Sequence, residues 1–171
     1  MSVMLFLTVR VLHVLLAALW IGAGVFFTLF LGPAVGDAGP AGGQVMSSLG
    51  RRGFLTYMAA VPGTTVLTGL YLYWRFTGGF DTAVMATHAG MAFGIGGLFG
   101  IIGLVIGGSV IGRCSRALLD LGAKMPSLPP AERGAAAQEM ARLTARVDTG
   151  GKVVAVLTTV AIALMALGHY I

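Results

Sequence analysis

The stretch VRVLHVLLAALWIGAG, residues 9–24, decides the fold, because it is apolar along its length apart from Arg10 and His13. It belongs to an apolar segment that runs from about Val3 to Leu31, and a helix needs only about 20 such residues to cross a bilayer. Polar side chains within a spanning helix are costly, and they usually face the protein interior. The stretch therefore predicts a membrane-spanning helix with Arg10 and His13 on its inward face.

The rest of the chain has the same character. Of its 171 residues, 57% are hydrophobic and 10% are charged, whereas a soluble domain carries about 25% charged residues. Three further apolar segments follow, at about 54–76, 82–111 and 153–170. Because backbone polar groups must be paired within lipid, all four segments should be helices. We expect an all-α fold in which residues 1–171 form a single membrane domain, an integral membrane four-helix bundle.

The connections between these segments differ. Residues 33–53 are rich in glycine and predict a loop, and residues 77–81 predict a short turn. The long connection contains an alanine-rich stretch with charges at helical spacing, which predicts an extramembrane cytoplasmic helix over about 130–148. This helix either ends at a relaxed joint formed by Gly150 and Gly151 or continues into the fourth segment.

The basic residues predict the orientation of the chain. Nine of the 11 lysines and arginines lie in the first and third connections, and two lie on the opposite side. The nine are Arg51, Arg52, Arg113, Arg116, Lys124, Arg133, Arg142, Arg146 and Lys152, and the two are Arg10 and Arg75. Positive residues favour the cytoplasmic side, so we expect a multi-pass protein of a bacterial-type cytoplasmic membrane with both termini on the extracytoplasmic side. The lipid bilayer accounts for the net charge of +5, and no nucleic acid is expected as a partner.

The three histidines form the most informative pattern, because His13, His88 and His169 all fall in the predicted outer half of the membrane. We expect His13 and His88 to lie on parallel helices at depths that differ by about one helical turn. Two neutral imidazoles on different helices can ligate the iron of haem b axially. His13 and His88 are therefore the predicted ligands. His169, closer to the surface, is typical of an interfacial residue and is the reserve ligand.

Other side chains would complete such a cofactor site. Arg10 precedes His13 by three residues and so shares its helical face, where it would neutralise a haem propionate. Arg75 is a second propionate candidate. Trp20 continues the His13 face and either walls the cofactor pocket or packs in the core.

Two other patterns leave alternatives open. Met85 and Met91 flank His88 at three residues on either side. Thioethers beside an imidazole suit copper, but methionine is also common filler in apolar helices. The glycines of the third segment indicate close helix packing, room for a flat macrocycle, or a homodimer interface. They are Gly90, Gly94, Gly96, Gly97, Gly100, Gly103, Gly107 and Gly108.

Two segments resemble a known group of membrane proteins. LHVLLAALWIGAGVFF, residues 12–27, resembles the first helix of the copper-resistance protein D (CopD) family and of HemJ-type protoporphyrinogen oxidases. RRGFLTYMAAVPGTTVLTGLYLYWR, residues 51–75, is similar to their second helix. The resemblance covers roughly residues 8–112 and implies haem b bound through His13. The family's third-helix lysine has His88 near its place here, in ATHAGMAF, residues 86–93, which suits a bis-histidine site.

The leading hypothesis is a haem-b-binding membrane protein that transfers electrons or oxidises a small hydrophobic substrate, a quinol or a porphyrinogen. The alternatives are copper binding or transport of the CopD type and a structural subunit without a cofactor. Cys114 is the only cysteine, so the chain cannot form an internal disulfide or a thiolate metal cluster. No catalytic residue is predicted, because the sequence contains no HExxH, CxxC or Walker motif.

Overall fold

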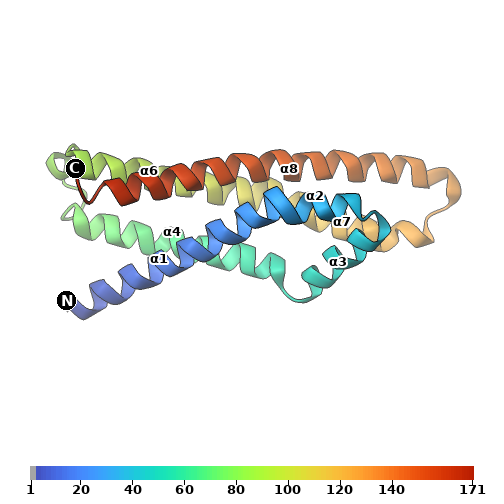
Figure 1. Cartoon of the computed structure of the whole chain (residues 1–171), viewed down its shortest axis with the longest axis horizontal. Helices are drawn as coiled ribbons and strands as arrows, with labels where there is room; N and C mark the ends of the chain where they lie inside the picture. Colours follow the sequence, from blue (N-terminus) through green and yellow to red (C-terminus); the bar gives the residue numbers. More distant parts are fainter. Residues whose placement is uncertain (1–2) are drawn as a thin grey trace.

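The computed structural model describes residues 3–171, and most of these residues are helical, with no β-strand among them (Figure 1). The α-helices are α1 (Val3–Phe26), α2 (Gly32–Asp37), α3 (Pro40–Arg51), α4 (Phe54–Phe76), α5 (Thr82–Met85), α6 (His88–Ile106), α7 (Gly112–Lys124) and α8 (Pro130–Leu167). Three continuous helical stretches are long and apolar enough to cross a membrane: Val3–Asp37, His88–Ser127 and Pro130–Leu167. The all-α class is thus confirmed, and the apolar helices indicate a multi-pass membrane protein.

The second predicted span, α4, is a 23-residue helix but is less apolar than these three. Threonines and tyrosines interrupt its hydrophobic residues. Its threonine hydroxyls donate to backbone carbonyls one turn earlier, as in Thr64 to Ala60 (2.9 Å), so they are already paired within the helix. Pro62 is buried inside α4. That all four long helices cross a membrane, with both termini outside, stays a prediction.

The prediction of a loop over residues 33–53 is wrong, because α2 and α3 occupy most of that range. The first helix does not end at Gly32 and Pro33. It passes through a π-helical turn, Phe27–Leu31, in which the amide of Gly32 bonds to the carbonyl of Phe27. Pro33 then falls in the first turn of α2, directly after this π-helical turn. Gly39, with φ of 55°, separates α2 from α3.

The third predicted helix, 82–111, begins with a break. The short α5 ends at Met85, and α6 begins at His88 after Thr87. The Thr87 hydroxyl accepts the amide hydrogen of Gly90 (3.0 Å) and so caps α6. His88 therefore lies in the first turn of α6 and not about two turns inside a longer helix, as the sequence suggests.

The Gly150–Gly151 pair is not a joint, because α8 runs unbroken through it for 38 residues. Both glycines are contact points. A Cβ at Gly150 would lie 3.1 Å from a side-chain carbon of Ile111, and one at Gly151 would lie 2.8 Å from the hydroxyl of Thr28. Ile111 belongs to a second π-helical turn, Gly107–Ile111, and Thr28 belongs to the first, Phe27–Leu31. Because Gly150 and Gly151 have no side chains, both turns can pack against α8 at these two positions.

The four long helices pack in two pairs that also contact each other. The most extensive contacts join α6 to α8 and α1 to α4, and further contacts join α4 to α6 and α1 to α8. The start of α1, the end of α4, the start of α6 and the end of α8 lie at the same end of the molecule, called here the first end (Figure 1). At the opposite end, α7 and the first half of α8 extend beyond α4 as an antiparallel pair (Figure 1).

Glycines on α6 allow the close approach of α8. A Cβ at Gly96 would lie 3.2 Å from both the carbonyl oxygen of Ala161 and a side-chain carbon of Met165. Gly97, the next residue, has open space where its Cβ would be. Close packing therefore depends on particular glycines and not on the number of glycines in the helix.

We predict that Gly96→Ile destabilises the protein by about 1–3 kcal/mol, because the added side chain meets the α8 backbone. Gly97→Ile is the matched control, because it is the same substitution at a position where the added Cβ has nothing within 4 Å. Thermal unfolding in detergent should show a lower Tm for Gly96→Ile than for Gly97→Ile. Equal Tm values would contradict the packing described for α6 and α8.

Candidate functional site

His13 is held in one orientation by α4. Its Nδ1 lies 2.9 Å from the carbonyl oxygen of Thr65 and 3.1 Å from the hydroxyl oxygen of Thr68. The Thr68 hydroxyl donates its own hydrogen to backbone carbonyls of α4, so both neighbours of Nδ1 are acceptors. The proton of the neutral ring therefore lies on Nδ1, and Nε2 keeps its lone pair. No hydrogen bond within residues 3–171 uses this Nε2.

Gly69 makes the space for this ring. A Cβ at Gly69 would lie 2.8 Å from Cε1 of His13, closer than real Cβ contacts come. Gly63 on the same helix has nothing within 4 Å of its Cβ position. The glycine at 69 is therefore required by the imidazole and not by the helix.

Arg10 and His169 bind each other, although 159 residues separate them in the chain. An Nη of Arg10 lies 2.5 Å from Nε2 of His169, and Nδ1 of His169 lies 3.1 Å from the carbonyl oxygen of Met165. A guanidinium can only donate, so Nε2 accepts and the ring proton is on Nδ1. Both ring nitrogens of His169 are thus in use. Arg10 forms no ion pair with any described acidic residue.

Two phenylalanines extend this contact across the first end of the molecule. Phe93 of α6 packs edge-on against His169 (centroids 5.2 Å apart) and against Phe76 of α4 (5.1 Å). The series Phe76, Phe93, His169 and Arg10 therefore connects α4, α6, the end of α8 and α1 in turn. We call these four residues the end cluster.

His88 stands outside the end cluster. Its side chain is exposed, and none of the hydrogen bonds or ring contacts among residues 3–171 involves it. Its position along the helix follows from Phe93, five residues later on α6. At 1.5 Å per residue, His88 lies roughly 7 Å nearer the end of the molecule than Phe93.

The depths of the histidines differ more than the sequence suggests. His13 lies roughly 4–5 Å deeper than Arg10 along α1, which is about one turn. Arg10 and Phe93 both contact His169, so they lie at a similar depth. Helices α1 and α6 run in the same direction (Figure 1). His13 lies deeper than this level and His88 lies nearer the end of the molecule, so the two histidines differ in depth by about 12 Å, or two turns. His169 lies about one turn from His13.

The other two predicted site residues take different places. Trp20 is 5% exposed, and its ring lies 3.5 Å from the Cβ position of Gly103, so it is a core residue between α1 and α6. Arg75, in the last turn of α4, is exposed and lies 6.0 Å from the ring of Trp74. The structure brings neither of them into contact with His13.

A groove next to His13 is apolar and open. It has a volume of about 280 Å³ and is lined by Leu5, Val9, Leu67, Thr68 and Tyr71. Thr68 also contacts the His13 ring. Within residues 3–171, no three or more histidine, cysteine, aspartate or glutamate side chains gather as metal ligands. His13 and His88 lie on separate helices, α1 and α6.

Comparisons of the chain with protein-family models, with curated proteins and with solved structures found no match.

The residues that hold His13 were not among the site residues predicted from the sequence. Thr65, Thr68 and Gly69 form one polar, small face of α4, and the letters TTVLTG at 64–69 carry that signal at helical spacing. No sequence pattern predicts the bond between Arg10 and His169, because it depends on how α1 and α8 are placed relative to each other.

We predict that Gly69→Ala displaces the His13 ring and breaks its bond to Thr65, because the new methyl group would lie only 2.8 Å from Cε1 of the ring. Nitrogen-15 NMR of histidine-labelled protein above pH 8 should show loss of the Nδ1-protonated form for His13 alone. Gly63→Ala is the matched control. An unchanged His13 signal in Gly69→Ala would contradict the placement of the ring.

Proposed function

We propose that this chain is a haem-b-binding integral membrane protein that transfers electrons or oxidises a small hydrophobic substrate, a quinol or a porphyrinogen. One observation carries the proposal: His13, in an apolar helix, donates through Nδ1 to the Thr65 carbonyl and leaves Nε2 free. Ligating histidines characteristically use this arrangement, because the Nδ1 bond fixes the ring and raises the basicity of the other nitrogen.

The proposed setting is a cytoplasmic membrane of bacterial type, with four spans and both termini outside. The three apolar helices support a bilayer setting. The threonine hydroxyls of α4 donate to backbone carbonyls of the same helix, which lowers the cost of placing α4 in lipid as a fourth span. The distribution of lysine and arginine supports the orientation. The end cluster and the histidines then lie in the outer half.

His13 is the first proposed axial ligand, and the second is either His88 or His169. The depth of His169, about one turn from His13, supports His169, whereas His88 is about two turns away. Arg10 now donates to the lone pair of His169 that a metal would use. When bound, haem would supply a one-electron redox centre.

The charged side chains would serve the propionates. Arg10 has no acidic partner among the described residues, so its guanidinium is available to an anion at the level of the end cluster. Arg75 is the second candidate. The apolar groove lined by Val9 and Thr68 is the proposed access for a quinol or porphyrinogen.

Copper binding has less support. That hypothesis needs Met85, His88 and Met91 on one face of one helix, but α5 ends at Met85 and α6 begins at His88. Met85 and Met91 therefore lie on different helices, separated by the Thr87 cap.

The test of the proposal is the absorption spectrum of the purified protein with its iron and copper contents, followed by the spectra of three variants. We expect a low-spin haem spectrum that is lost in His13→Ala, because the anchored ligand is removed. The second ligand is identified by whichever of His88→Ala and His169→Ala also converts the haem to a high-spin form.

A protein purified with no haem, or a spectrum unchanged by His13→Ala, would overturn the proposal. If His88→Ala changes the spectrum and His169→Ala does not, then α6 shifts relative to α1 when haem binds, because His88 and His13 now differ in depth by about two turns.

The orientation has its own test. A periplasmic reporter fused after Ile171 should be active and a cytoplasmic one inactive, because nine of the 11 basic residues lie in the connections assigned to the cytoplasm. The same reporters inserted after Pro126, between α7 and α8, provide the control and should give the opposite result. A cytoplasmic signal at the C-terminus would reverse the topology.

A further inference from the structure

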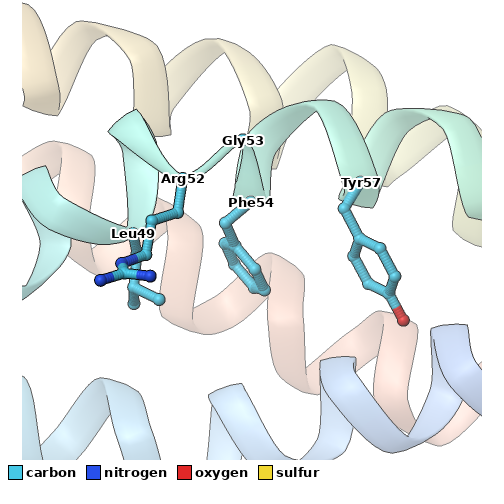
Figure 2. A pocket seen from close by; sticks show the side chains of 5 residues that line it. All are labelled: Leu49, Arg52, Gly53, Phe54 and Tyr57. Carbon is cyan, nitrogen blue, oxygen red and sulfur yellow. The ribbon is translucent and has the colours of Figure 1, made fainter.

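A second groove lies at the turn between α3 and α4, far along α4 from His13. It has a volume of about 320 Å³ and is lined by Leu49, Arg52, Gly53, Phe54 and Tyr57. Figure 2 shows the side chains of Leu49, Arg52, Phe54 and Tyr57 on the same side of the turn. Gly53 forms the bend between the two helices, in a left-handed conformation (φ of 82°) that favours glycine.

One wall of the groove is aromatic and rigid. The Phe54 ring stacks on Phe27 of the first π-helical turn (centroids 5.6 Å apart) and lies 6.4 Å from the Tyr57 ring. The Tyr57 hydroxyl donates to the carbonyl of Leu19 (3.1 Å), which fixes the ring against α1. The wall is therefore an apolar surface that is already in place before anything binds.

The other end of the groove carries an unpaired charge. The Arg52 guanidinium has no hydrogen bond and no ion pair within residues 3–171. Its neighbour Arg51 differs, because it donates to the hydroxyl of Ser47 (2.8 Å) on its own helix. Of the two adjacent arginines, only Arg52 therefore combines a free guanidinium with an apolar wall.

We propose that this groove binds an anionic phospholipid of the cytoplasmic leaflet, with the phosphate on Arg52 and the start of an acyl chain along Phe54 and Tyr57. An amphiphile is required because the groove joins a cation to an apolar surface. An anionic headgroup is complementary to Arg52, which has no hydrogen bond or ion pair with the described residues. Basic pockets on the cytoplasmic side of membrane helices take lipid headgroups for the same reasons.

The proposal rests on the membrane setting and orientation proposed above, but not on the haem. Arg52 and the end cluster lie toward opposite ends of α4, so lipid binding and haem spectra can fail separately. A variant that loses lipid but keeps the spectrum of the unaltered protein separates the two sites.

The experiment measures lipid retained by the full chain in a neutral detergent, by native mass spectrometry, with phosphatidylglycerol and phosphatidylcholine in equal amounts. We expect a preference for phosphatidylglycerol that falls about tenfold in Arg52→Gln, as for loss of a charge-assisted hydrogen bond. Arg51→Gln is the matched control, with the same change of charge one residue away, and should change it less than twofold. Arg52→Lys should keep part of the preference, and it replaces Arg52→Gln if that variant fails to fold.

Three results would overturn the proposal: equal losses in Arg51→Gln and Arg52→Gln, equal retention of the two lipids, and no effect of either substitution. A parallel arm uses inorganic phosphate alone and records the Tm. If phosphate raises the Tm as much as phosphatidylglycerol does, the site takes a free anion and the lipid assignment is wrong.

Discussion

The arrangement of α1 against α4 depends on an imidazole packed where residue 69 has no side chain. His13 enters this space, and its Nδ1 reaches a carbonyl oxygen of α4. In an apolar setting an unpaired ring N–H would cost several kcal/mol, so the bond to Thr65 and the space at Gly69 are needed together. The bond also fixes the register of the two helices, because neither can slide by a turn without losing it.

At the first end of the molecule, a charged side chain in the apolar helix α1 is stabilised by a hydrogen bond to a histidine. Arg10 carries a full charge in the same apolar helix, and no described carboxylate neutralises it. It donates to His169 instead, which has its other nitrogen on the Met165 carbonyl and its ring against Phe93. This contact joins the start of α1 to the end of α8, whereas His13 joins α1 to α4. The two polar residues of α1 thus attach it to two different helices.

Composition and periodicity were enough to predict an all-helical chain and the range of α4, because long apolar segments leave no alternative in lipid. The predictions based on glycine-rich sequence were wrong. The glycine-rich residues 33–53 form helices, and the Gly150–Gly151 pair lies inside α8. The reason is tertiary: a glycine in a helix costs about 1 kcal/mol against alanine, but here it allows contacts with Thr28 and Ile111. No property of the local sequence distinguishes a glycine that ends a helix from one that admits a neighbour.

The same limit applies to the site. The sequence identifies His13 and Arg10 as polar residues in an apolar segment. Depth along a helix, however, depends on where the helix begins, and the Thr87 cap places His88 in the first turn of α6. His169 then lies closer in depth to His13 than His88 does, and its Nε2 lone pair accepts a hydrogen bond from Arg10. Arg10 and a metal would compete for one nitrogen. Occupation of the site through His169 would therefore release the guanidinium at the depth where propionates need a cation, so ligation and charge neutralisation would be coupled through this single hydrogen bond.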